Sequence, residues 1–147
     1  MHPYGEDMHL DLDQRRRVAD ARVARLATVR PDGYPHVVPI SFAFGDATIV
    51  TAIDHKPKTT ASLQRLRNIE AAPVASVIID HYEDDWSRLW WLRADGTARI
   101  VPDGREWEDG IERLTQKYQQ YRSDAPRGPL IVITVERWTS WSADQGA

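Results

Sequence analysis

The stretch Thr51-Ala-Ile-Asp-His-Lys-Pro-Lys-Thr-Thr-Ala-Ser-Leu-Gln-Arg-Leu-Arg-Asn68 contains the junction around which the other elements are arranged. It begins at the end of an apolar, β-branched run, residues 48–53, which is typical of a strand. After a short polar segment, Pro57 stands where a helix would begin, because its fixed φ suits the first helical turn. Apolar residues then recur at three-residue spacing from Leu63 to Ile69. We therefore predict a strand, a short loop and a helix.

The start of that helix carries positive charge and a hydroxyl group. Lys56, Lys58 and Thr59 lie around the helix N-terminus, where unpaired backbone N–H groups and the helix dipole favour anions. This arrangement suits a phosphate group. A solvated basic helix face shows the same pattern, so the local sequence leaves both interpretations open.

Composition limits the class of protein. The 147 residues suit a single domain, and 28% charged with 41% hydrophobic residues is typical of a soluble globular protein. The net charge of −3 argues against a dedicated nucleic-acid binder. The absence of cysteine excludes disulfides, thiolate metal sites and a cysteine nucleophile. Because we find neither a membrane-spanning apolar run nor a signal-peptide pattern, we expect a cytoplasmic protein.

Further strands are predicted on both sides of the junction. Strands at 23–29 and 36–44 flank the turn at 31–33, and with 48–53 they would form an antiparallel meander. Pro39 cannot donate a ladder hydrogen bond, so it indicates an edge or a bulge.

The ends of the chain and its second half complete the predicted set. Six to seven mostly antiparallel strands with flanking helices close most easily into a barrel, here one domain over residues 1–147. Residues 1–10 are expected to be a flexible tail. The remaining predictions are a helix capped by Asp11 or Asp13 and ending near Asp20, strands at 74–80 and 130–138, strands at 88–93 and 97–101 around an Asp95-Gly96 hairpin turn, and a helix with its apolar face at Trp107, Ile111, Leu114 and Tyr118.

Four runs, in this order, resemble a known superfamily. They are Ala24-Arg-Leu-Ala-Thr-Val29, Asp32-Gly-Tyr-Pro-His-Val-Val-Pro-Ile40, Lys56-Pro-Lys-Thr59 and Ala72-Pro-Val-Ala-Ser-Val-Ile-Ile-Asp80. Together they resemble the pyridoxamine 5′-phosphate oxidase-like, flavin-binding split-barrel superfamily.

Three further runs narrow the resemblance. These are His55-Lys-Pro-Lys-Thr59, Asp80-His-Tyr-Glu-Asp-Asp-Trp-Ser-Arg-Leu-Trp-Trp91, and the ending Glu136-Arg-Trp138 with Trp141. They are similar to the actinobacterial branch that uses the deazaflavin coenzyme F420.

The resemblance implies a split β-barrel that forms a homodimer with two cofactor sites at the dimer interface. The cofactor phosphate would be held at Lys56, Lys58 and Thr59. The flavin or deazaflavin ring would lie along the second and third strands, and the partner subunit would add an aromatic wall. The remaining residues assigned to the cofactor are His36, Val38, Pro39, Ser41, Thr51, Ala52, Arg65, Trp86 and Trp90.

The function implied is an F420-dependent oxidoreductase that transfers a hydride between the reduced cofactor and a small unsaturated or carbonyl-containing molecule. An FMN-dependent oxidase or reductase, or a non-catalytic flavin- or haem-binding protein, are the alternatives. The C-terminus lacks the paired arginines of members that oxidise pyridoxine phosphate, so we do not expect that substrate. No catalytic residue or metal ligand is assigned, because the cofactor carries the chemistry in such enzymes.

Binding of F420 in place of FMN would require additional positive charge. F420 carries an acidic glutamyl tail that FMN lacks, and the candidates to contact it are Arg65 and three arginines of the first helix, Arg15, Arg16 and Arg17. Solvation explains the same three arginines equally well.

Overall fold

The computed structural model describes residues 5–7, 9–45, 47–53 and 60–144, with the backbone alone for 5–7 and 60–63. The strands are β1 (Gly5–Asp7), β2 (Ala24–Val29), β3 (Pro35–Ile40), β4 (Ala43–Gly45), β5 (Thr48–Ala52), β6 (Val74–His81), β7 (Trp90–Val101) and β8 (Leu130–Ser142). The helices are α1 (Leu12–Asp20), α2 (Thr60–Ala71), the 3-10 turn η1 (Trp86–Arg88), α3 (Arg105–Lys117) and α4 (Gln119–Ser123).

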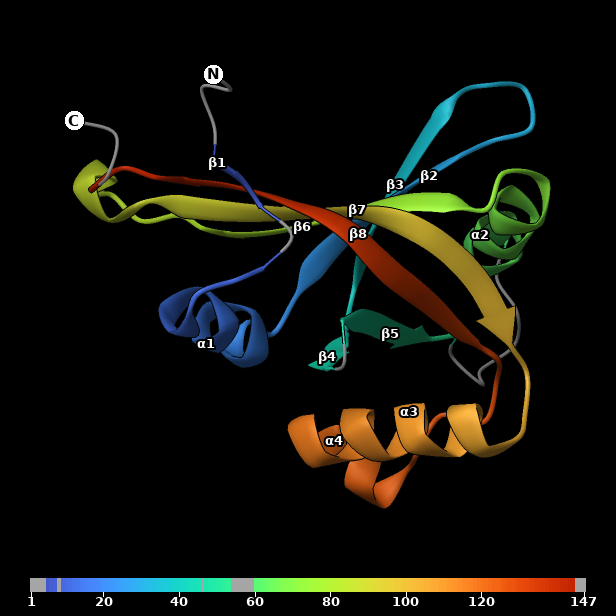
Figure 1. The fold of residues 1–147 in the computed structure, drawn as a ribbon. Helices are drawn as coiled ribbons and strands as arrows, with labels where there is room; N and C mark the ends of the chain where they lie inside the picture. The colour runs from blue at the N-terminus through green and yellow to red at the C-terminus, as the bar shows by residue number, and fades with distance from the viewer. Residues whose placement is uncertain (1–4, 8, 46, 54–59, 145–147) are drawn as a thin grey trace.

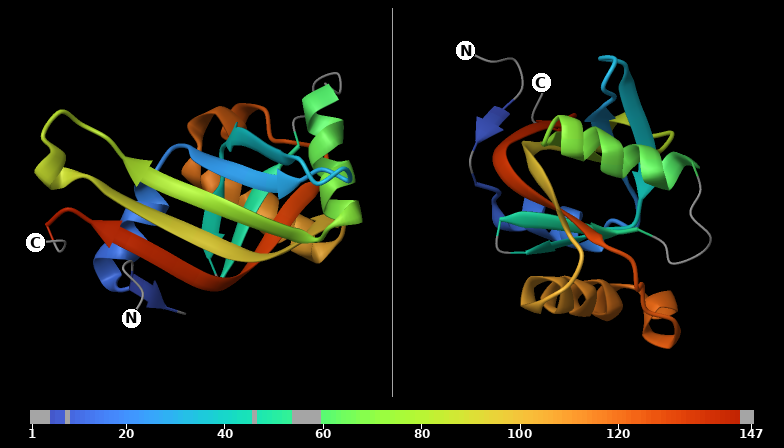
Figure 2. Two further views of the ribbon diagram at one scale, coloured as in Figure 1. Left: turned by 90° about the horizontal axis from the view of Figure 1, so that it is seen from above. Right: turned by 90° about the vertical axis from the view of Figure 1, so that its right-hand side faces the viewer.

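One antiparallel sheet forms the body of the protein. Its strands follow the order β3-β2-β6-β7-β8-β5-β4, and β1 pairs with β8. The sheet curls around an apolar core, with α1, α3 and α4 on one side and α2 at one end (Figures 1 and 2). This is the predicted split barrel, mainly β with flanking helices.

The predicted meander is wrong in one respect, the continuity of its second strand, whereas both of its pairings are present, β2 with β3 and β4 with β5. β5 pairs with β4 and β8, and β3 lies at the far edge of the sheet beside β2. The expected strand over 36–44 is interrupted after Ile40 and resumes as β4, so the chain crosses from one end of the sheet to the other. Pro39 therefore lies in an edge strand, where its missing N–H is tolerated.

The predicted hairpin at Asp95-Gly96 is also wrong, because β7 runs through these residues as one strand. Asp95 pairs with Arg137 and Gly96 with Val135, so β8 carries one extra residue, Glu136. This is a β-bulge, which bends a strand pair and increases its twist. Both strands curve strongly along their length in Figure 1. A Cβ atom at Gly96 would lie 2.0 Å from the Thr134 carbonyl oxygen, so the glycine permits close backbone approach at a bulge and does not form a turn.

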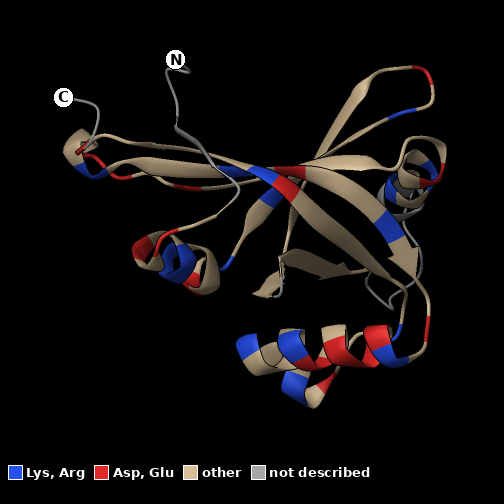
Figure 3. Ribbon diagram, viewed as in Figure 1, with Lys and Arg blue, Asp and Glu red and all other residues tan. Residues whose placement is uncertain are grey.

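Charged side chains stabilise the bulge from the face that the helices leave uncovered. Asp95 accepts hydrogen bonds from Ser76 Oγ at 2.5 Å and Arg137 at 3.2 Å, and Arg93 lies 3.4 Å away. Partial burial opposes ionisation of Asp95, but the hydrogen bonds from Ser76 and Arg137 outweigh it and lower the pKa of this carboxyl group. Figure 3 shows both signs of charge on β7 and β8 in the middle of the sheet.

The first helix begins as predicted. Asp11 is its N-cap and accepts a hydrogen bond from the Gln14 backbone N–H at 2.8 Å, while the Gln14 side chain accepts one from the Asp11 N–H at 2.9 Å. This reciprocal capping box fixes the start of the helix. The helix ends at Asp20 and buries Val18 alone, so its arginines lie outside the core.

The ends of the chain contain more strand than predicted. Within the expected tail, residues 5–7 form β1 and pair with residues 138–140 of β8, and Leu10 belongs to the core. β8 continues to Ser142, past the predicted end at Trp138, so Trp141 lies in a strand. No helix in the described ranges is long and apolar enough to cross a membrane.

Candidate functional site

The predicted phosphate-binding residues fall between β5 and α2. Lys56, Lys58 and Thr59 lie outside the described residues, so their role stays a prediction from the sequence. The flanking elements have the predicted types, although α2 is described from Thr60 onward. Arg65, on α2, is partly buried, and this burial lowers the pKa of its guanidinium group.

The predicted ring surface on β3 has two different faces. His36 and Val38 are half-buried, whereas Pro39 is exposed. His36 pairs across the ladder with Thr28, whose hydroxyl accepts a hydrogen bond at 3.0 Å from the fully buried Asn68 of α2. The His36 Nδ1 atom is buried and has no hydrogen-bond partner among the described residues. An orphaned polar atom on this strand suits a ligand that supplies the missing partner.

The structure brings together two further residues predicted to contact the cofactor, Ser41 and Thr51. Thr51 is buried, and its hydroxyl donates to the Ser41 carbonyl oxygen at 2.7 Å. The Ser41 hydroxyl forms a 2.7 Å hydrogen bond with the Tyr121 hydroxyl. Ala52 pairs with Leu130 at the end of β5. The two hydrogen bonds connect the segment after β3 with β5 and α4, directly before the undescribed loop.

The two predicted tryptophans lie elsewhere. Trp86 is 67% exposed in η1, and Trp90 begins β7, at the end of the sheet opposite α2 (Figure 1). Trp90 stacks on His81 with ring centroids 6.2 Å apart, and the Arg17 guanidinium lies 5.0 Å from its ring centroid. His81 also hydrogen-bonds Glu83. Within one chain, these residues therefore lie away from α2 (Figure 1).

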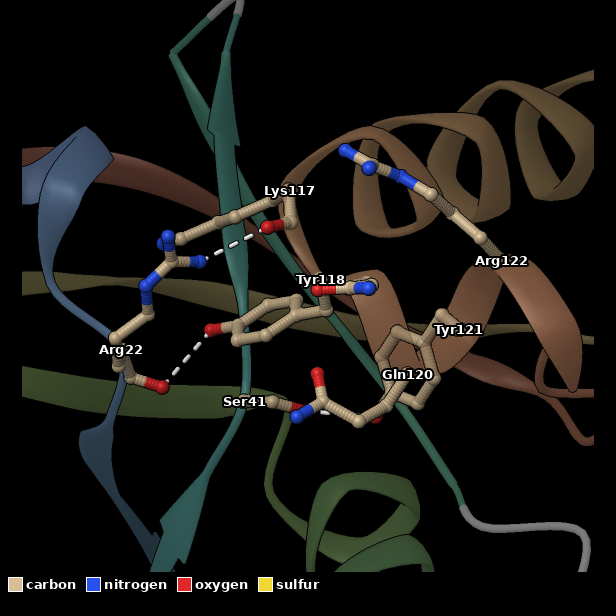
Figure 4. Close-up of a pocket in the computed structure, with 8 residues that line it drawn as sticks. Arg22, Ser41, Lys117, Tyr118, Gln120, Tyr121 and Arg122 are labelled. Carbon is tan, nitrogen blue, oxygen red and sulfur yellow. Dashed lines mark hydrogen bonds between the residues drawn. The ribbon is translucent and has the colours of Figure 1, made fainter.

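A cavity of about 690 Å³ lies beside Ser41 (Figure 4). Its cationic walls are Arg22, Lys117 and Arg122, and its aromatic walls are Tyr118 and Tyr121. The described residues that line it include no carboxylate. Sequence reasoning missed this cluster, apart from Ser41 and the assignment of Tyr118 to an apolar helix face.

The cavity is held in shape by hydrogen bonds between segments far apart in sequence. Arg22 donates to the Lys117 carbonyl oxygen at 2.8 Å. The Tyr118 hydroxyl donates to the Arg22 carbonyl oxygen at 3.0 Å and accepts from the Phe42 backbone N–H at 3.0 Å. The link between α1 and β2 is thereby joined to the end of α3 and to the segment after β3.

Comparison with known proteins gives relatives of two kinds. The chain is 28% identical over 120 residues to the F420H(2)-dependent biliverdin reductase of Mycobacterium tuberculosis. The matched region covers 82% of this chain and 80% of the relative. Among solved structures, the conserved hypothetical protein Rv2991 of Mycobacterium tuberculosis superposes with a TM-score of 0.75 at 20% identity, covering 93% of this chain and 87% of the other. HutZ, a heme storage protein from Vibrio cholerae, superposes with a TM-score of 0.69 at 20% identity, covering 90% and 96%.

The structural relatives share the fold, and their low identity carries no further information on function. The sequence itself is more specific. Residues 11–142, from the N-cap of α1 to the end of β8, match the family described as pyridoxamine 5′-phosphate oxidase. The chain belongs to the pyridoxamine 5′-phosphate oxidase family.

Proposed function

We propose that this protein is an F420-dependent oxidoreductase acting on a small unsaturated or carbonyl-containing molecule. The observation that carries the proposal is the 28% identity to an F420H(2)-dependent biliverdin reductase over 82% of the chain. Membership of the family supports a flavin-like cofactor in general. The deazaflavin is the more specific part of the proposal.

The described residues fit a flat cofactor ring beside β3 and β5. His36 offers a buried Nδ1 atom without a partner, and Ser41 and Thr51 add hydroxyl groups that are already held in position. Val38 offers apolar surface on the same face of β3 as His36, whereas Pro39 lies on the opposite, exposed face. When bound, the cofactor supplies the hydride chemistry, and the residues of the chain bind the ring and orient it.

Two alternatives remain as proposals of lower specificity. FMN has a ring and a phosphate that would use the same residues. The second alternative is haem binding, because structural neighbours such as the heme storage protein HutZ share the fold at 20% identity. His81 is engaged with Glu83 and Trp90. His36 and His81 lie on separate strands, β3 and β6.

Binding titrations with F420, FMN and haemin test the proposal directly. We expect F420 to bind most tightly. Salt should weaken the binding of F420 more than the binding of FMN, because the glutamyl tail of F420 adds exposed charge contacts. Arg16 is exposed on α1, whereas Arg15 donates to the Leu10 carbonyl and Arg17 lies over Trp90. Because α1 and α2 lie apart in one chain, such contacts would require a second chain (Figure 1). Tighter binding of FMN at low and high salt would contradict the choice of F420, and a Soret band without deazaflavin binding would favour haem.

We also propose that the protein is a symmetric homodimer. The helices leave one face of the sheet uncovered, and large side chains are exposed on the chain, among them Trp86 at 67% and Val37 at 62%. Exposed apolar area of this kind favours association, and a specific interface buries more than about 1,000 Å². Sedimentation equilibrium at micromolar concentration should give twice the mass of the chain. A single monomeric species would contradict both the dimer and cofactor sites shared between subunits.

A further inference from the structure

The ammonium group of Lys117 lies in an environment that is unfavourable for a positive charge. Its Nζ atom is buried, lies 3.7 Å from the centroid of the Phe42 ring and has no hydrogen-bond partner among the described residues. Burial, with a smaller contribution from Arg22, lowers the pKa of Lys117 to about 8, and Asp20 opposes that shift. A buried ammonium group without a partner is costly, and a ring contact offsets only part of that cost.

A second cation faces the first. The Lys117 side chain extends towards Arg22 in the cavity (Figure 4). The Arg22 guanidinium uses one N–H on the Lys117 carbonyl and lies 5.8 Å from the centroid of the Tyr118 ring. No carboxylate among the described residues lines the cavity, although the charge of Asp20 acts on Lys117 from outside it. Two like charges are thus held together, an arrangement that a bound anion would stabilise.

The remaining walls favour an anion attached to a flat organic group. Ser41 and Tyr121 share one hydrogen bond, so one of their two hydroxyl hydrogens stays available to a ligand. Tyr121 offers a partly exposed ring, and the largely buried Tyr118 ring lies edge-to-face against it, with the centroids 5.6 Å apart. Gln120 adds an amide at the rim of the cavity. Cavities with apolar walls and a few placed polar groups are typical of sites for small molecules.

We propose that this cavity is a binding site for an organic carboxylate, whose negative charge lies between Lys117 and Arg22 and whose ring packs against Tyr121. The site is built from described residues alone and does not depend on the identity of the cofactor. Its position beside Ser41 places it next to the surface proposed for the cofactor ring. The carboxylate would belong either to a substrate or to the glutamyl tail of F420.

The first test compares a charged probe with a neutral one. Benzoate and benzamide have the same ring and nearly the same shape, and they are titrated against the cofactor-free full chain by NMR. Because charge-assisted hydrogen bonds are about twice as strong as neutral ones, benzoate should bind at least about tenfold more tightly. Equal affinity of the two probes would overturn the proposal.

Matched variants then assign the effect to the cavity. Lys117→Met keeps the aliphatic stem and removes the ammonium group, so benzoate should lose its advantage over benzamide. Arg30→Met removes the same charge from the exposed loop between β2 and β3, at a distance from α3, and should bind benzoate like the wild type. Thermal unfolding of each variant shows that it is folded. Unchanged benzoate affinity in a folded Lys117→Met protein would contradict the site.

The pH dependence of benzoate binding is a separate readout. With the pKa of Lys117 at about 8, the charged fraction falls about tenfold between pH 7 and pH 9, and the affinity for benzoate should fall with it. Burial raises the pKa of Tyr118, so this hydroxyl stays protonated over that range. Arg22 and Asp20 are the other charged groups that act on Lys117. The fall should vanish in Lys117→Met, and a flat profile in the wild type would refute the assignment.

Competition with F420 identifies the source of the carboxylate. If F420 displaces benzoate, the cavity takes the glutamyl tail of the cofactor. If benzoate binds equally well in the presence of F420, the cavity takes a carboxylate of another molecule, which makes carboxylic acids the substrate class. Both results support the site, and its test requires no activity measurement, so failure of the F420 assignment would be recognised separately.

Discussion

Replacement of Gly96 by alanine is expected to lower the free energy of unfolding by about 3 kcal/mol, because the new methyl group would overlap backbone atoms. Its Cβ atom would lie 2.0 Å from the Thr134 carbonyl oxygen and 2.9 Å from the Thr134 carbonyl carbon. Neither atom can move without separating β7 from β8 at the bulge. These two strands form the longest ladder of the sheet, so the strain would be placed at its centre.

Urea denaturation at one fixed protein concentration measures this change, since association would otherwise alter the apparent stability. Gly45→Ala is the matched control. Its Cβ atom would lie nearest the Arg113 guanidinium, at 3.5 Å, which is an ordinary van der Waals contact. We expect a change below about 1 kcal/mol there. Equal midpoints for the two variants would show that the bulge accommodates a side chain.

Gly96 also shows why one element could not be predicted from sequence. The dipeptide Asp95-Gly96 is among the strongest local signals for a two-residue hairpin. The dipeptide indicates only a local preference for a turn, whereas the bulge arises because β8 carries Glu136 as an extra residue opposite Asp95 and Gly96. The pairing of β7 with β8 joins segments that are far apart in the chain. Local preference and tertiary pairing conflict here, and the pairing determines the outcome.

Other elements were predictable because their determinants lie within a few residues. Asp11 and Gln14 form the capping box of α1 by themselves. Pro39 indicated an edge strand, since proline removes a donor wherever it lies. The strand before the loop and the helix after it were visible in their apolar spacing. The order of these elements predicted a barrel, and the resemblance to the flavin-binding superfamily implied its split form.

The cavity beside Ser41 had no such local signal. Arg22 and the Lys117 carbonyl are 95 positions apart, and their contact depends on how α3 packs beneath the sheet. The family resemblance therefore implied Ser41 and Thr51 as neighbours of a cofactor, but nothing in the sequence predicted the cations beside them. A cluster that forms only through packing requires a structure to be seen.

Lys58→Ala is expected to weaken cofactor binding by about ten- to a hundredfold. The sequence places Lys58 in the polar run at the start of a helix, and a charge-assisted hydrogen bond to a phosphate contributes about 1.5–3 kcal/mol. Lys58 stands outside the apolar stripe of that helix, so stability should change little. Fluorescence titration with F420 measures the affinity, and urea denaturation checks the fold.

The phosphate assignment is separable from the choice of cofactor. F420 and FMN both carry a phosphate, so Lys58→Ala should weaken both, whereas haem carries none and its binding should not change. Arg67→Ala is the matched control. Arg67 is exposed on α2, so its replacement removes one positive charge from the neighbouring helix. A loss confined to Lys58→Ala would locate the phosphate at the loop between β5 and α2. An equal loss in both variants would indicate a general electrostatic attraction, and unchanged affinity in Lys58→Ala would remove the phosphate site from this loop.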